Sequence, residues 1–260
     1  MITKTITLRK NFNLAYWERP AEDESPIVFI HGFGSKKDYF RYAFDSPSLK
    51  GFHLLAVDLI GFGQSTGPDE FDYSMKDQAA IVIELLDHLE LQTFHLCGHS
   101  MGGLVVMEIA ELEPQRALSL INLEGNLTLE DCFVSGLVAG STLAEFEEKG
   151  RRDLENDFRE EGFHEYADSF VQASTVALYK SACHTVEESS TPLVERLSKI
   201  KNVCYVYGDA NKGVYPGEKL LHAAGVPVFY IEDAGHSMAV ENPQQLYSVI
   251  RSFIDSLSLA

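Results

Sequence analysis

The chain of 260 residues is long enough for one large α/β domain that carries an inserted segment. Its 39 acidic residues outnumber its 21 basic residues, which argues against binding to nucleic acid or to an anionic membrane. No apolar run approaches the roughly 20 residues that a membrane span needs. The first 20 residues alternate apolar with polar positions and therefore do not read as a signal peptide.

Strands and helices alternate along most of the chain. Strands are predicted over residues 2–8, 12–17, 26–30, 53–57, 94–97, 117–123, 203–207 and 226–231. The first two are expected to pair antiparallel through a turn at Lys10-Asn11. Helices are predicted over residues 39–44, from the capping box at Ser74 to Leu89, after Ser100, and from Pro243 onward. Such alternation predicts a mostly parallel, doubly wound sheet with helices on both faces.

The alternation of strands and helices stops between residues 127 and 190, where apolar residues recur at helical spacing and no convincing strand occurs. This segment is too apolar for a disordered linker. We therefore predict an inserted lid of three or four helices over the site. The predicted division is a first part of the core over residues 1–126, the helical lid over 127–190, and the second part of the core over 191–260.

A short apolar strand over residues 94–97 leads into Gly98-His99-Ser100-Met101-Gly102, and helical spacing follows at once. This strand, turn and helix form the context in which G-x-S-x-G becomes a nucleophile elbow. The turn is so tight that side chains two residues before and after the serine would strike the backbone. The helix N-terminus beneath the serine would face a developing oxyanion with free N–H groups.

Three stretches together resemble the α/β-hydrolase family. They are the elbow sequence Gly98-His99-Ser100-Met101-Gly102-Gly103, the upstream His31-Gly32-Phe33-Gly34, and the late Gly235-His236. The resemblance implies an α/β-hydrolase fold with Ser100 as nucleophile and His236, in a loop after the last strand, as its base. It also implies an oxyanion hole formed by the backbone N–H groups of Phe33 and Met101, with His31 supporting the oxyanion loop.

The acid of the triad departs from the commonest pattern of that family, which places an aspartate three residues after the glycine that ends the strand at 203–207. This chain has Asn211 there, in Gly208-Asp209-Ala210-Asn211. A smaller group of relatives carries the acid after the strand that follows the elbow helix, where Glu124 stands. An asparagine cannot stabilise an imidazolium as a carboxylate does. We therefore predict Glu124 as the acid, with Asp209 as the alternative.

The predicted activity is hydrolysis of a carboxylic ester, or a similar acyl bond, of a small and largely neutral or apolar substrate through an acyl-enzyme. A carbon–carbon bond hydrolase or lyase of the same fold, and a slow-turnover ligand receptor, remain alternatives. We expect no metal site, no cofactor and no membrane span, in a monomer or homodimer. The four single cysteines, Cys97, Cys132, Cys183 and Cys204, indicate reduced thiols and a cytoplasmic protein.

Overall fold

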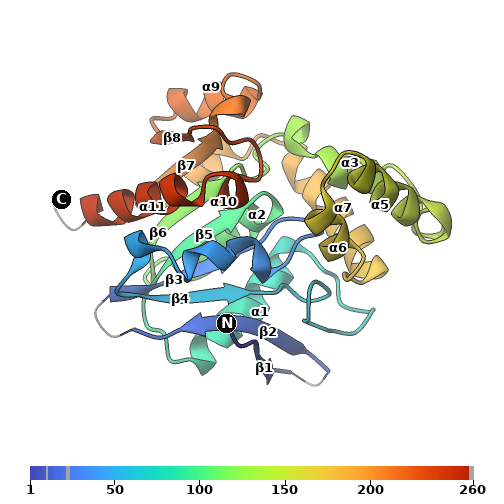
Figure 1. Ribbon diagram of the computed structural model, residues 1–260, viewed down its shortest axis with the longest axis horizontal. Coiled ribbons are helices and arrows are strands. Elements are labelled where there is room, and N and C mark those ends of the chain that lie inside the picture. Colours follow the sequence, from blue (N-terminus) through green and yellow to red (C-terminus); the bar gives the residue numbers. More distant parts are fainter. Residues whose placement is uncertain (10, 22–23, 258–260) are drawn as a thin grey trace.

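The computed structural model describes residues 1–9, 11–21 and 24–257. Within these ranges the strands form one eight-stranded sheet in the order β1-β2-β4-β3-β5-β6-β7-β8 (Figure 1). The strands are β1 (Lys4–Thr7), β2 (Asn13–Arg19), β3 (Glu24–Ile30), β4 (Phe52–Val57), β5 (Phe94–His99), β6 (Ala117–Leu123), β7 (Val203–Gly208) and β8 (Val228–Ile231). β1 and β2 are antiparallel to their neighbours, and all other pairs are parallel. The sequence-based prediction of a mostly parallel sheet is therefore confirmed.

The buried side chains of the central strands alternate between two apolar cores, because successive residues of a strand point to opposite faces. In β3, Val28 and Ile30 belong to one core, whereas Ile27 and Phe29 belong to the other. All four side chains have no exposed surface. Both faces of the sheet must therefore be covered by other elements, as a parallel sheet requires.

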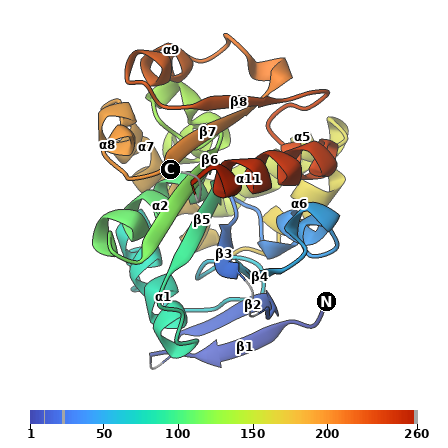
Figure 2. The ribbon, with the colours of Figure 1, turned by 90° about the vertical axis from the view of Figure 1, so that its left-hand side faces the viewer.

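Helices cover the two faces. The face of Val28 and Ile30 packs against α1 (Met75–His88) and α2 (Met101–Leu112), and the other face packs against the 3₁₀ segment η1 (Lys37–Ala43) and α11 (Pro243–Leu257). Figure 2 shows α1 and α2 on one side of the sheet and α11 on the other. The Ser74 side chain accepts a hydrogen bond from the Asp77 N–H and so caps α1, as the sequence predicts.

Every described element between β6 and β7 is helical. The elements are η3 (Leu129–Asp131), α3 (Phe133–Ala139), α4 (Leu143–Glu145), the π-helical η4 (Phe146–Gly150), α5 (Arg151–Glu160), α6 (His164–Phe170), α7 (Thr175–Ser189) and α8 (Val194–Ser198). Figure 1 shows α3, α5, α6 and α7 gathered at the side of the molecule away from α11. Three buried phenylalanines, Phe146, Phe158 and Phe170, join this helical segment to the core that contains α1 and α2.

Most predicted elements recur with shifted ends. The bounds of β6 coincide with the predicted strand, whereas the helix predicted over 39–44 is a 3₁₀ segment that begins at Lys37. The strand predicted over 226–231 begins only at Val228. The helices α9 (Pro216–Ala223) and α10 (Met238–Glu241) were not predicted. Lys10, in the predicted first turn, and the last three residues of the predicted unit 191–260 lie outside the described residues.

Candidate active site

The loops that carry the predicted site residues all leave parallel strands at the same edge of the sheet. Phe33 follows β3, Ser100 follows β5, Glu124 follows β6, and the loop with His236 follows β8. Ligands of parallel α/β sheets bind beyond this carboxyl edge. The order of strands in the sheet therefore places at one edge residues that are as far apart in the sequence as Phe33 and His236.

Ser100 sits on a strained turn between β5 and α2. Its φ of 52° and ψ of −125° lie in a region that non-glycine residues seldom adopt. A Cβ on Gly98 would overlap the carbonyl of Gly102, and a Cβ on Gly102 would overlap the carbonyl oxygens of Ile30 and His31. The serine is partly exposed, whereas its neighbours in the turn are buried. The turn thus presents one hydroxyl at the sheet edge, as the elbow motif predicts.

The imidazole of His236 is oriented by Glu124. The Nδ1 atom lies 2.8 Å from Oε2 of Glu124, whose side chain is 4 % exposed, whereas the imidazole is 39 % exposed. A carboxylate only accepts hydrogen bonds, so Nδ1 carries the proton and the opposite nitrogen, Nε2, is free to accept one. This is the arrangement that a general base for a serine hydroxyl requires.

The Glu124 carboxylate is held by donors on every side. Oε1 accepts from the Gly208 N–H at 2.8 Å and from the Asn211 amide at 3.0 Å, and the same amide lies 2.9 Å from Oε2. Asn211, at the position where the commonest family pattern has an acid, therefore donates to a carboxylate that arrives from the neighbouring strand. These contacts give hydrogen-bond partners to both oxygens of a side chain that is almost fully buried.

Asp209, the alternative acid, does not reach His236. It is exposed, and its Oδ1 accepts from the Ala234 N–H at 3.3 Å. It therefore fastens the start of the loop that carries His236, two residues before the imidazole.

His31 fixes the peptide that carries the predicted oxyanion donor. Its Nδ1 donates to the Gly32 carbonyl at 2.8 Å, and its Nε2 accepts from the Leu59 N–H at 3.0 Å. Burial lowers the pKa of His31, so the ring stays neutral in this tautomer. The Gly32 carbonyl and the Phe33 N–H share one peptide plane and point in opposite directions. By holding the Gly32 carbonyl, His31 also fixes the direction of the Phe33 N–H, which is the supporting role that the family resemblance implies for it.

A second histidine, His99, connects the elbow to the loop of His236. Its Nε2 donates to the carbonyl of His236 at 2.8 Å, and its ring stacks on Tyr39 with centroids 4.2 Å apart. The Tyr39 hydroxyl donates to the same carbonyl at 3.3 Å. Burial lowers the pKa of His99 well below its usual value, which keeps the ring neutral. The residue before Ser100 thereby holds the backbone of His236, the predicted base.

The sequence did not predict three contacts around the site. Tyr39 lies 197 residues from His236, Tyr166 contacts Phe33 across 133 residues, and the Asn211 amide serves as donor to Glu124. For Asn211 the sequence did contain a signal, because an asparagine stands where the commonest family pattern has an aspartate. For the two tyrosines no local pattern marks the contact, because it depends on how distant elements pack.

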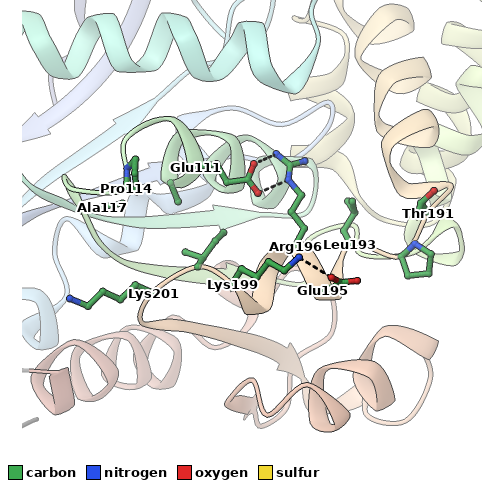
Figure 3. A pocket seen from close by; sticks show the side chains of 12 residues that line it. Glu111, Pro114, Ala117, Thr191, Leu193, Glu195, Arg196, Lys199 and Lys201 are labelled. Carbon is green, nitrogen blue, oxygen red and sulfur yellow. Dashed lines mark hydrogen bonds and ion pairs between the residues drawn. The ribbon is translucent and has the colours of Figure 1, made fainter.

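A hollow of about 720 Å³ lies at the opposite edge of the sheet, where β6 begins (Figure 3). Arg196 of α8 crosses it, with Nε 2.6 Å from Oε1 of Glu111, and also pairs with Glu108. The hollow contains none of the predicted site residues. Within the described ranges, no group of three histidine, cysteine or acidic side chains is arranged to hold a metal ion.

Comparison with known proteins defines the class. A model of the alpha/beta hydrolase fold family matches residues 25–177, which is more than half of the chain. The chain therefore belongs to this family, and it is an enzyme of the α/β-hydrolase class. No helix among residues 1–9, 11–21 and 24–257 is both long and apolar enough to cross a membrane.

Similar proteins include two bacterial lipases. Lipase 3 of Moraxella sp. (strain TA144) is 29 % identical over 273 residues, which cover 98 % of this chain and 85 % of that protein. Lipase 1 of Psychrobacter immobilis is 27 % identical over 275 residues, which cover 97 % and 85 %. A thermophilic esterase from Thermogutta terrifontis has a similar structure, with a TM-score of 0.76 over 99 % of both chains. Its sequence identity of 18 % means that this likeness concerns the fold.

Proposed function

We propose that this enzyme hydrolyses carboxylic esters through an acyl-enzyme formed on Ser100. One observation carries the proposal: the Nδ1 of His236 is held by a buried carboxylate, and the His236 ring lies 4.6 Å from the ring of His99, the residue before the serine on the strained elbow. A serine hydroxyl is a weak nucleophile at neutral pH and needs such a base. A protein that only binds its ligand has no use for this arrangement.

In the proposed mechanism Nε2 of His236 takes the hydroxyl proton as Ser100 attacks the ester carbonyl. The imidazolium that forms is stabilised by Glu124 through the 2.8 Å contact at Nδ1. The backbone N–H groups of Phe33 and Met101 receive the oxyanion, and Met101 adds the positive end of the α2 dipole. His236 then protonates the leaving alcohol, and a water molecule that it activates releases the acid.

The surroundings of His236 favour a neutral substrate with an apolar part. The Phe133 ring of α3 lies 6.4 Å from the His236 ring and 5.5 Å from that of Tyr215, and Phe133 is 48 % exposed. An exposed aromatic side chain beside a base offers a surface for a hydrocarbon group. The lipase relatives support the same substrate class. We propose that the helical segment over residues 127–190 acts as the lid that selects among such esters.

A labelling and turnover experiment tests the proposal. Wild-type protein should react with a fluorophosphonate probe and hydrolyse p-nitrophenyl esters continuously. Ser100→Ala should lose labelling and, like His236→Ala, should lose roughly 10⁴-fold or more in kcat while keeping its fold by circular dichroism. Ser190→Ala and His88→Ala, at exposed positions, serve as matched controls and should behave as wild type.

Each other outcome has a meaning. Labelling without sustained turnover of esters would favour a receptor. Labelling of an enzyme that is inert to esters of every chain length would favour carbon–carbon bond cleavage. More than a tenth of wild-type turnover in Ser100→Ala would refute the assignment of the nucleophile.

A further inference from the structure

The helix α6 touches the loop that would bind the oxyanion. The hydroxyl of Tyr166 donates a hydrogen bond to the carbonyl oxygen of Phe33 at 2.9 Å. The contact is close, because a Cβ on Gly34 would lie 2.7 Å from Cδ2 of Phe170 and 2.8 Å from the Tyr166 hydroxyl. A part of the helical segment therefore packs directly onto Phe33 and Gly34.

The hydrogen bond from Tyr166 is made to the peptide between Phe33 and Gly34, which has fewer other constraints than the preceding peptide between Gly32 and Phe33. The Gly32 carbonyl is already held by His31 at 2.8 Å and by the Ser35 N–H at 3.2 Å. The next peptide leads into Gly34, whose φ is 65°, and a glycine accepts either sign of φ with little cost. Rotation of that peptide would turn the Phe33 carbonyl and change the direction of the backbone beside the oxyanion donor. The Tyr166 hydroxyl opposes this rotation.

The Tyr166 side chain is suited to a fixed hydrogen bond. Its ring packs edge-on against Phe158, with centroids 4.9 Å apart, and lies 6.2 Å from Phe170. Burial raises the pKa of Tyr166, so the hydroxyl remains a donor throughout the working range of the enzyme. A hydrogen bond from a packed aromatic side chain costs little conformational freedom, because the ring is already immobile.

Two further contacts lie on either side of Tyr166 in the sequence, one between α6 and η1 and one between the residues that follow α6 and precede η1. Arg41 pairs with Glu165 at 2.9 Å, and Lys36 donates to Gln172 at 3.0 Å. Both lie at the surface, where such pairs contribute little stability. They join the same two stretches of the chain as the hydrogen bond from Tyr166 to Phe33.

We propose that Tyr166 is a positioning residue for the oxyanion loop: by holding the Phe33 carbonyl it keeps the Phe33 N–H directed at the oxyanion. This inference rests on the proposed serine mechanism. Under this proposal α6 contributes to stabilising the transition state of ester hydrolysis, in addition to any role of the helical segment in selecting substrates.

The test uses two matched substitutions in the full-length enzyme. Tyr166→Phe removes the hydroxyl from the oxyanion loop. Tyr179→Phe removes a hydroxyl of the same helical segment that donates to the carbonyl of Ser141 at 3.0 Å, away from that loop. Each variant loses one hydrogen bond to a main-chain carbonyl and retains its ring, and the melting temperature of each is measured to separate a loss of stability from a kinetic effect.

Tyr166→Phe should lower kcat on the order of tenfold, less than the roughly 10²–10³-fold that follows removal of an oxyanion donor itself. KM for a short ester should change by less than about twofold, because the contact matters most when the oxyanion forms. The inhibition constant of a trifluoromethyl ketone, which forms an oxyanion on the serine, should rise in parallel with the loss of kcat/KM. Tyr179→Phe should match wild type in all three measurements.

Several results would overturn the inference. Equal kinetics of the two variants would show that the Tyr166 hydroxyl has no special role. A rise of KM alone would make Tyr166 a wall of the substrate pocket, and a displaced acid limb of the pH–rate profile would place its effect on His236. Failure of the serine mechanism is recognised separately, because wild-type enzyme would then not react with the fluorophosphonate probe.

Discussion

Replacement of Glu124 by glutamine should trap His236 in the wrong tautomer. Oε1 of this carboxylate accepts from the Gly208 main-chain N–H, which can only donate, whereas the Asn211 amide contacts both oxygens and can rotate to offer its own oxygen. In Glu124→Gln the new amide oxygen must face the Gly208 N–H, so its NH₂ group faces Nδ1 of His236. Nδ1 must then accept, the proton moves to Nε2, and the base can no longer take the proton of Ser100.

The size of the effect follows from this tautomer argument. Loss of a triad carboxylate in a serine protease, with geometry intact, costs about 10⁴-fold in kcat. That factor corresponds to about 5.5 kcal/mol of transition-state stabilisation. Asp209→Asn keeps the oxygen that accepts from Ala234, at an exposed position. Its effect should stay within about 0.5 kcal/mol, or roughly twofold.

The assay is kcat on a p-nitrophenyl ester for wild type and both variants, with circular dichroism to verify the fold. A third variant tests whether a second carboxylate can replace Glu124. In the Glu124→Gln background, Asn211→Asp places a carboxylate at a position whose side chain contacts residue 124, and part of the activity should return if this carboxylate accepts the hydrogen bond from Nδ1 of His236. A nearly active Glu124→Gln beside an inactive Asp209→Asn would reverse the assignment. Two fully active single variants would mean that the acid lies elsewhere.

Two further predictions concern stability. Burial, together with the nearby Glu108, raises the pKa of Glu188 to about 7. Because this folded-state pKa lies above the unfolded value, folding stability falls by up to about 3 kcal/mol as pH rises from about 4.5 to 7. Glu188→Gln should therefore melt above wild type at pH 8 and lose most of that advantage at pH 5; an advantage independent of pH would refute the reasoning. Gly102→Ala should cost about 3 kcal/mol or more in urea unfolding, because its Cβ would overlap two carbonyl oxygens. The control Gly136→Ala, within α3, should be neutral or slightly stabilising, because the new Cβ would lie 4.0 Å from Cβ of Cys132.

The sequence was most informative where structure is local. The strand, the glycine turn and the helix around Ser100 occupy about 20 consecutive residues, and each step has a short-range cause: strand propensity, a backbone approach that excludes Cβ atoms, and helical spacing. The alternation of strands and helices likewise sufficed for a parallel sheet. Element ends were less well predicted, as the late start of β8 at Val228 shows, because they depend on pairing with a neighbouring strand.

The sequence alone thus determined the fold class and the tight turn that carries Ser100, and it predicted His236 as the base. Only the tertiary structure decided which carboxylate meets that base. β6 and β7 are neighbours in the sheet, so Glu124 and Asp209 both lie at its edge, and the directions of their side chains separate them. The same holds for Tyr166 and Phe33, 133 residues apart. Such contacts arise from the packing of whole elements, which no local pattern of residues encodes.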